Sequence, residues 1–213
     1  MTLRRAVYHN PSARSWTAPA LDEKNATAIQ AFHQQLPGYA PTRLVSLDAV
    51  AREQGLKAVY LKDESNRLGL TSFKILGASW GAFKAITQKL GLPTTASLAE
   101  VQKLVAERPV TLFAATDGNH GRAVAHMGAI LGAKVKIFVP SSMNLETIEL
   151  IKKEGANLVV VNASYDVAVQ QAFTAADEER GILIQDTSFA EYKEIPAVRS
   201  AFPRVHQHIL TLC

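Results

Sequence analysis

Short apolar segments alternate with amphipathic segments through the middle of the chain. Four apolar segments have the length of strands, and three segments between them have the spacing of helices. In chain order they are 110–115, 122–131, 134–139, 145–154, 158–161, 165–180 and 182–185. The first strand is apolar at nearly every position, which is typical of a parallel strand buried on both faces. The alternation predicts a three-layer α/β fold with a parallel sheet.

The flanking residues are less regular. Residues 1–25 contain Pro11 and Pro19 and read as an irregular arm, and the α/β alternation stops after Pro196. Residues 197–213 are expected to form a weak helix at most. The remaining predicted elements are helices at 26–36, 47–54, 76–90 and 98–106, and a strand at 58–62.

Composition limits the classes of protein to which the chain can belong. The chain has 213 residues, 47% of them hydrophobic and 20% charged, with a formal net charge of +4. Its 23 Lys and Arg residues are scattered, so charge gives no support for nucleic-acid binding, and an anionic small molecule is an equally good partner. Cys213 is the single cysteine, so no disulfide forms within the chain. No segment reaches the roughly 20 apolar residues of a membrane helix, and the histidines lack ligand spacing. We therefore expect a cytoplasmic protein without a metal.

Two segments carry candidate chemistry. A charged loop, residues 62–74, leads to Lys74 at the start of an apolar helix, where burial lets a lysine lose its proton and react with an aldehyde. Residues 115–122 follow the buried strand and lead into a helix. The two glycines allow close approach of the backbone, and the free N–H groups of the helix N-terminus can bind an anion. Taken singly, each segment has an ordinary explanation. Lys74 would be solvated, and Asp117 or Asn119 would cap the helix.

Together these segments indicate one group of enzymes far more specifically than either does alone. KDES at residues 62–65, SFK at 72–74 and DGNHGR at 117–122 resemble the fold-type II pyridoxal-phosphate enzymes, which are tryptophan synthase beta-like. The resemblance implies that Lys74 holds the aldehyde of pyridoxal 5'-phosphate, that Asn119 contacts its 3′-oxygen, and that Phe73 belongs to the cofactor site.

Asp117 and residues 184–196 narrow this resemblance to the diaminopropionate ammonia-lyase family. That resemblance implies α,β-elimination of 2,3-diaminopropionate to pyruvate and ammonia, as part of amino-acid catabolism. Lys74 would take the α-proton of the L isomer and Asp117 that of the D isomer. Asp186 would hold the cationic β-amino group, or else be a turn residue at a strand end.

Three further residues have weaker assignments. His120 and Arg122 are expected to support the loop rather than react. Tyr165, at a helix start, either edges the site or has a core or capping role.

The resemblance also implies a domain arrangement. Residues 1–75 would form an arm and part of a large domain, 76–187 a small α/β domain, and 188–213 a return to the large domain with an atypical tail. The family's Gly-rich phosphate loop has no match after Gly181, so the large domain is expected to be incomplete and the chain truncated. The full-length family is expected to form homodimers. Two alternatives stay open: a catalytically incompetent fragment that acts at most as an interaction partner, and a serine/threonine dehydratase-like enzyme.

Overall fold

Four parallel strands form the centre of the molecule. The structure, a computed structural model, describes residues 23–186. The strands are β3 (Thr111–Ala115), β4 (Lys134–Pro140), β5 (Asn157–Val161) and β6 (Ile182–Leu183). Their order is β5-β4-β3-β6, and every neighbouring pair is parallel. The predicted parallel sheet is confirmed.

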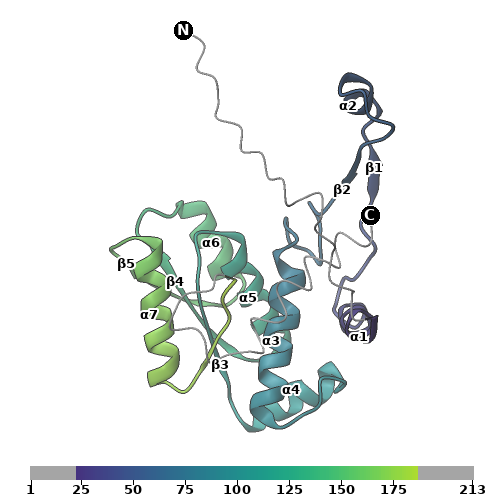
Figure 1. Ribbon diagram of the computed structural model, residues 1–213. Helices are drawn as coiled ribbons and strands as arrows, with labels where there is room; N and C mark the ends of the chain where they lie inside the picture. Colours follow the sequence, from purple (N-terminus) through teal and green to yellow (C-terminus); the bar gives the residue numbers. More distant parts are fainter. Residues whose placement is uncertain (1–22, 187–213) are drawn as a thin grey trace, which may run out of the picture.

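Helices cover both faces of this sheet (Figure 1). Helix α5 (Asn119–Leu131) connects β3 to β4, and α6 (Leu145–Lys153) connects β4 to β5. Helix α7 (Tyr165–Glu178) then leads back across the sheet to β6, beyond β3. Because crossover connections are right-handed, this reversal of direction places α7 on the opposite face from α5. Helices α3 (Lys74–Leu90) and α4 (Leu98–Glu107) pack against α5 and complete its layer.

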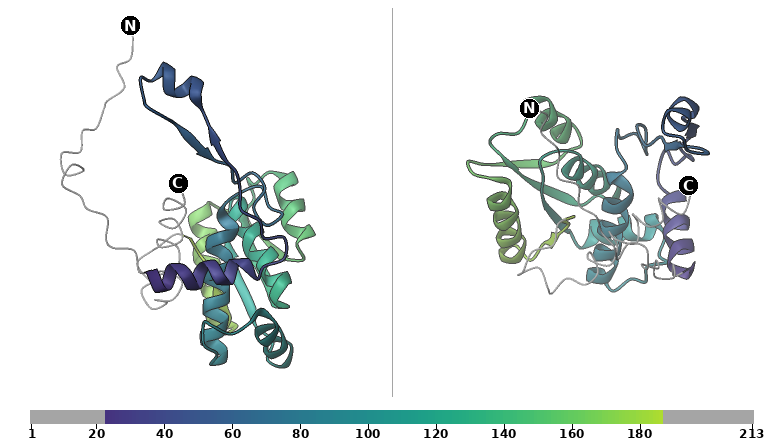
Figure 2. Two further views of the ribbon diagram at one scale, coloured as in Figure 1. Left: turned by 90° about the vertical axis from the view of Figure 1, so that its right-hand side faces the viewer. Right: turned by 45° about the horizontal axis from the view of Figure 1, so that its top comes forward.

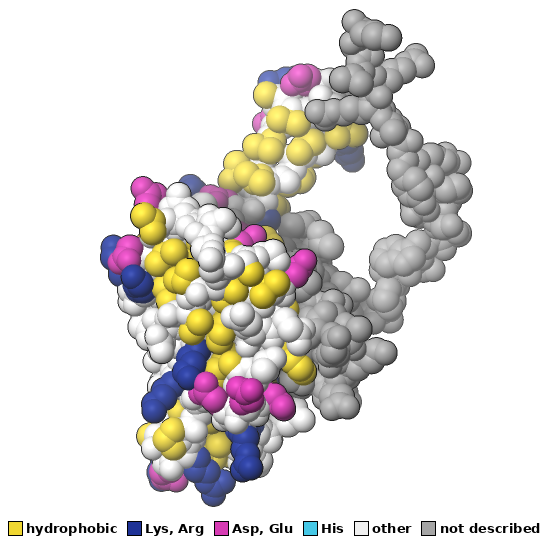
Figure 3. All heavy atoms as spheres, turned by 90° about the vertical axis from the view of Figure 1, so that its left-hand side faces the viewer, with side chains coloured by type: hydrophobic (Ala, Val, Ile, Leu, Met, Phe, Trp, Pro, Cys, Tyr) yellow, Lys and Arg dark blue, Asp and Glu magenta, His cyan; other side chains and the backbone are white. Residues whose placement is uncertain are grey.

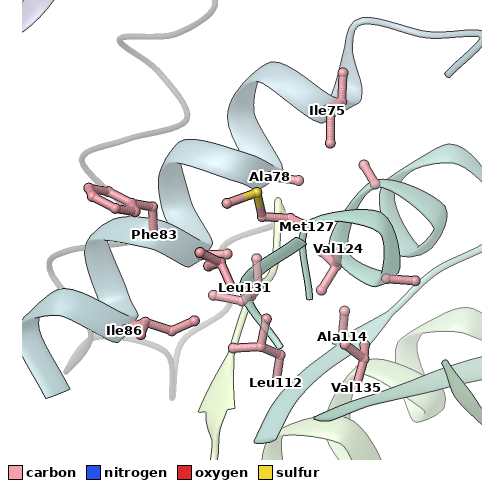
Figure 4. Close-up of a cluster of buried hydrophobic side chains, with 14 of the residues drawn as sticks. Ile75, Ala78, Phe83, Ile86, Leu112, Ala114, Val124, Met127, Leu131 and Val135 are labelled. Carbon is pink, nitrogen blue, oxygen red and sulfur yellow. The ribbon is translucent and has the colours of Figure 1, made fainter. Parts of the chain in front are cut away.

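Each strand contributes to both apolar layers. Leu112 and Ala114 of β3 face the core shared with α3 and α5, which Figure 4 shows, whereas Phe113 and Ala115 pack with residues of α7. All four side chains are essentially inaccessible to solvent. Burial on both faces is why the sequence of this strand is apolar without alternation.

The start of α5 differs from the sequence prediction. The helix begins at Asn119 rather than at residue 122, and neither Asp117 nor Asn119 is its N-cap, because Gly118 has that position without a side-chain cap. Gly121 suggested a loop but lies in the first turn. A Cβ there would approach Thr116 Cγ2 to 2.2 Å, so close packing of the helix against the strand end requires the glycine.

Other boundaries shift by a few residues. Helix α3 begins at Lys74 rather than 76, α7 ends at Glu178 rather than 180, and β6 is limited to Ile182–Leu183. Terminal turns are where local sequence patterns are least decisive.

The N-terminal part contains one strand that the sequence analysis missed. Strand β1 (Leu44–Ser46) pairs antiparallel with β2 (Tyr60–Lys62), and α2 (Asp48–Glu53) lies between them in sequence. Figure 2 shows this β1–α2–β2 arm projecting from the α/β body. Three residues are too few for a recognisable alternation.

Helix α1 (Glu23–Gln34) packs on α3, where the rings of Phe32 and Phe83 lie 4.5 Å apart. No helix within residues 23–186 is both long enough and apolar enough to cross a membrane. Of the predicted irregular arm, 1–25, residues 23–25 belong to helix α1 and the rest lie outside the described residues. The predicted return to the large domain with its tail, 188–213, also lies outside them.

Candidate active site

Three helices begin at one pocket of about 340 Å³, beyond the carboxyl ends of β3 and β6. Lys74, Asn119 and Tyr165 are the first residues of α3, α5 and α7. The lining residues are Lys74, Thr116, Asp117, Gly118, Asn119, His120, Tyr165 and Asp186. Strand carboxyl ends are where open parallel sheets bind ligands, and helix N-termini favour anions.

The central contact of the pocket is an ion pair. Lys74 Nζ donates a hydrogen bond to Asp186 Oδ2 over 2.6 Å. The lysine side chain is 32% exposed and the aspartate side chain 16% exposed, so the pair lies at the pocket wall within reach of a ligand.

Asp186 remains a carboxylate despite its burial. Burial by itself would raise the pKa of this carboxyl group. The charge that His120 carries when protonated, the hydrogen bond from Lys74 and the charge of Lys74 bring the pKa below its usual value of 3.8. The pocket therefore holds a fixed negative charge that can bind a cationic amino group.

His120 is buried beside this carboxylate. Its Nε2 lies 2.8 Å from the carbonyl oxygen of Ile184, and its Nδ1 lies 3.7 Å from Asp186 Oδ2. Because a carbonyl oxygen only accepts, Nε2 carries the proton. Burial lowers the pKa of the imidazole below 6.5, against the opposing effects of the Asp186 charge and the Ile184 hydrogen bond. His120 is thus a neutral donor to the backbone at pH 7, consistent with the predicted supporting role.

The loop that carries Asp117 and Asn119 is organised by Thr116. Its Oγ1 accepts hydrogen bonds from the backbone N–H groups of Gly118, at 2.9 Å, and Gly121, at 3.0 Å. The sequence analysis did not assign Thr116 a role. A hydroxyl residue between a buried strand and a glycine was the available signal.

Gln185 was also missed. It is 2% exposed, and its side-chain oxygen accepts from the N–H of Ala115 over 3.1 Å. Its side-chain nitrogen donates to the hydroxyl oxygen of Tyr165 over 2.8 Å. The bridge joins the ends of β3 and β6 to the start of α7, and it places Tyr165 at the site edge.

Two predicted residues do not line the pocket. Phe73 is the N-cap residue of α3, with its ring centre 5.8 Å from Lys74 Nζ. Arg122 extends toward the end of α6, where its Nε donates to Glu154 Oε1 over 3.0 Å. His126 Nδ1 lies 2.8 Å from the other oxygen of Glu154. Arg122 therefore ties α5 to α6.

The loop before Lys74 is held by a partly buried cluster of polar side chains. Arg67 is 6% exposed and donates from Nε and Nη2 to the two carboxylate oxygens of Glu64. Arg67 Nη2 also donates to the hydroxyl of Thr42 over 2.8 Å, and Thr42 donates to Glu64 over 2.6 Å. The bidentate pair gives the residues leading into α3 a fixed course.

A lysine, two carboxylates and an amide line a pocket at the carboxyl end of the parallel sheet. This is the place and the kind of lining expected of a small-molecule site in an α/β protein. The chain belongs to the pyridoxal-phosphate dependent enzyme family, whose model matches residues 35–202.

Individual relatives narrow the comparison. Diaminopropionate ammonia-lyase of Escherichia coli strain K12 is 34% identical over 196 residues, which are 92% of this chain and 49% of that protein. The Salmonella typhimurium LT2 protein of the same name is 35% identical over 174 residues, covering 79% and 43% of the two chains. The chain thus spans about half the length of the curated relatives it matches.

Solved structures agree. The apo form of the Escherichia coli ammonia-lyase superposes with a TM-score of 0.80 at 31% identity, covering 92% of this chain and 54% of that one. Its complex with D-serine gives 0.81 at 30% identity, with 92% and 51% coverage. These comparisons confirm the predicted family, its α/β fold and pyridoxal phosphate as its cofactor.

Proposed function

We propose that this chain forms the active-site pocket of a pyridoxal-phosphate-dependent ammonia-lyase, which converts 2,3-diaminopropionate to pyruvate and ammonia by α,β-elimination. The observation that carries the proposal is the ion pair of Lys74 and Asp186 in a pocket that Asp117 and Asn119 also line. The similarity to diaminopropionate ammonia-lyases over 92% of the chain supports it.

The described residues fit the aldehyde end of the cofactor. The pocket lies in the size range of small-molecule sites, and the primary amine of Lys74 is at its wall. Lys74 would hold the aldehyde, Asn119 would contact the 3′-oxygen, and Phe73 would lie beside them. When bound, the cofactor withdraws electrons from the α-carbon and makes its proton removable.

The chain's own groups would then move protons and orient the substrate. Lys74 takes the α-proton of the L isomer. Asp117 takes the α-proton of the D isomer, which points to the opposite face. Asp186 binds the cationic β-amino group, which leaves as ammonia. Hydrolysis by water then supplies the keto oxygen of pyruvate and releases the α-nitrogen as a second ammonia. The assignment of Asp186 uses its fixed charge and its distance of 2.6 Å from the Lys74 amine.

Cofactor loading and product formation test the proposal. The purified chain with pyridoxal phosphate should develop a visible absorption band that Lys74→Ala abolishes. Lys103→Ala, a change at an exposed position of α4, should keep the band. The loaded chain should release pyruvate from both diaminopropionate isomers. Absence of the band in the wild type would rule out catalysis by this chain.

The same assay distinguishes the proposed ammonia-lyase from the dehydratase alternative. Serine yields pyruvate and threonine yields 2-oxobutyrate when a hydroxyl group is eliminated. Faster turnover of either compound than of both diaminopropionate isomers would favour a dehydratase. Asp117, a carboxylate within the DGNHGR loop, favours the ammonia-lyase.

A second candidate function is favoured by the β1–α2–β2 arm. Leu44, Tyr60 and Leu61 are 46%, 59% and 51% exposed, and Figure 3 shows hydrophobic side chains over this projecting arm. The chain would then act as an interaction partner, either of a longer family subunit or as a homodimer. Co-purification with a longer homologue supports this function, and a stable isolated monomer by light scattering contradicts it. A cytoplasmic location and a role in amino-acid catabolism stay predictions.

A further inference from the structure

A second pocket lies at the opposite end of α3 and α7 from Lys74. Its volume is about 200 Å³, and it borders β6, the last strand in the sheet order. Both helices end beside it (Figure 1), whereas their first residues line the pocket of Lys74. At 1.5 Å per residue, Lys74 and Lys89 are about 22 Å apart along α3. The lining residues are Lys89, Phe173, Ala176, Asp177, Arg180, Gly181 and Leu183.

The buried part of this lining is apolar. Ala176 and Leu183 are 6% and 1% exposed, and Phe173, which is half-buried, packs against the same core cluster. Sites for drug-sized ligands have volumes of about 300–1,000 Å³, so a pocket of about 200 Å³ takes a smaller molecule. The apolar lining suits a small aliphatic group.

The backbone of Arg180, at the exposed side of the pocket, has an unusual conformation. Its φ is 51°, in the left-handed region where the residue after a helix is usually glycine. Lys89 Nζ donates to the carbonyl oxygen of Arg180 over 2.7 Å, and the N–H of Gly181 donates to the carbonyl oxygen of Ala176 over 2.7 Å. These contacts fix the position of Arg180 beside the pocket. A non-glycine residue held in this region is a reason to look for a functional role.

Two opposite charges at this pocket are available to a ligand. Within residues 23–186, the guanidinium of Arg180 and the carboxylate of Asp177 have no side-chain hydrogen bond or ion pair. A guanidinium binds carboxylates through paired N–H donors. Asp177 lies in the last turn of α7, and a helix C-terminus attracts a cation in addition to the carboxylate's own charge. The pair therefore suits a zwitterion.

We propose that this pocket is a second ligand site, which binds a free amino acid with an aliphatic side chain, such as leucine. Arg180 binds the carboxylate of the ligand, Asp177 binds its ammonium group, and the apolar lining covers its side chain. Diaminopropionate fits poorly, because its second ammonium group would lie against apolar surface. The inference goes beyond the proposed function and does not depend on it.

Three ligands with the same aliphatic group test the assignment of the two charges. They are L-leucine, L-leucinamide, which lacks the carboxylate, and 4-methylpentanoate, which lacks the amine. Ligand-observed NMR on the full chain, before pyridoxal phosphate is added, measures each dissociation constant. The methyl signals of the ligands report weak binding as well as tight binding.

Each variant should weaken only the ligands that carry the matching charge. Arg180→Asn removes the guanidinium and keeps a residue type that tolerates positive φ. It should raise the dissociation constant of L-leucine about tenfold and change that of L-leucinamide by less than about twofold. Asp177→Asn should raise the constant of L-leucine about tenfold and leave that of 4-methylpentanoate within about twofold. Arg108→Asn, after the end of α4, and Glu178→Gln, beside Asp177, are exposed controls that should change no constant.

A wild type that does not bind L-leucine at concentrations up to about 10 mM would overturn the inference. Equal losses for all three ligands would also overturn it, because Arg180 and Asp177 would then act only on the structure. Lys74→Ala should leave leucine binding unchanged, and a loss of binding in this variant would place leucine in the other pocket instead. Leucine binding without turnover of diaminopropionate contradicts the proposed function alone, and turnover without leucine binding contradicts this inference alone.

Discussion

Lys74 and Asp186 are separated by 112 positions in the sequence, and their side chains meet at 2.6 Å. The contact exists because α3 begins, and β6 ends, at the same edge of the sheet. It gives the lysine amine a defined position in the pocket before any ligand is bound. Under the proposed function, Lys74 would hold the cofactor aldehyde, and the Asp186 carboxylate would then be available to a cationic substrate group.

Asp117→Asn should have different effects on turnover of the two substrate isomers. An amide does not accept a proton as a carboxylate does, so turnover of D-diaminopropionate should fall about 100-fold or more, while turnover of the L isomer changes little. Pyruvate release, followed with a coupled lactate dehydrogenase assay, measures both rates. Asp166→Asn, an exposed change in the first turn of α7, should leave both rates unaltered. Equal losses for the two isomers would show that Asp117 is not an isomer-specific base.

His120 should titrate below the ordinary histidine value. Burial lowers the pKa of this imidazole, although Asp186 and the Ile184 carbonyl favour the charged form. On acidification the ring should therefore stay neutral at pH 6.5 and take up a proton only at lower pH. The ring resonances of the six histidines report each midpoint by NMR, and His120→Gln assigns the relevant signal. A midpoint at or above 6.5 would mean that the Asp186 charge outweighs burial.

Gly121→Ala should destabilise the loop that carries Asp117 and Asn119. The added methyl group would lie 2.2 Å from Thr116 Cγ2 and 3.0 Å from Ile137 Cγ2, so the helix start has to shift. Overpacking of this kind costs about 1–3 kcal/mol of unfolding free energy. Chemical denaturation measures the loss.

A second substitution can relieve the closest part of this clash, although Thr116 Cβ would still lie 2.9 Å from the added methyl group. Thr116→Ser removes Cγ2 and keeps the hydroxyl that accepts from Gly118 and Gly121. The double variant should therefore be more stable than Gly121→Ala alone. A double variant that is less stable would locate the strain elsewhere.

Glu154→Gln should weaken the connection between α5 and α6. Burial tends to raise the pKa of Glu154, but hydrogen bonds to His126 and Arg122, and their charges, lower it below 4.5 overall. The unfolded chain thus binds this proton more readily, and the carboxylate stabilises the fold above pH 4.5. The variant should lose about 1 kcal/mol at neutral pH. The difference from the wild type should shrink as the pH falls through the lowered pKa.

Urea denaturation over a pH series measures this difference. Glu149→Gln, whose ion pair with Lys152 is more than half exposed at both side chains, is the control on the same helix. Its effect should be below about 0.5 kcal/mol. Equal effects of the two substitutions would contradict a specific role for Glu154.

Local patterns in the sequence determined the layers of the fold and the centre of the site. The uninterrupted apolar character around Leu112 and Phe113 predicted a strand covered on both faces, and periodicity predicted α5, α6 and α7 to within a few residues. The SFK and DGNHGR segments identified Lys74 and Asn119, which line one pocket. These features depend on neighbouring residues, so they are visible in the chain itself.

Tertiary structure decided which distant groups meet. The return of α7 across the sheet places β6 beside β3, and only this brings Asp186 to Lys74 and Gln185 to Tyr165. The start of α5 likewise depends on the space left by Thr116 around Gly121. Helical and strand periodicities specify which face of an element is buried, but they carry no information on which element will cover it. The place of Lys74 at the start of a helix was therefore predictable, whereas its partner was fixed by the order of the strands.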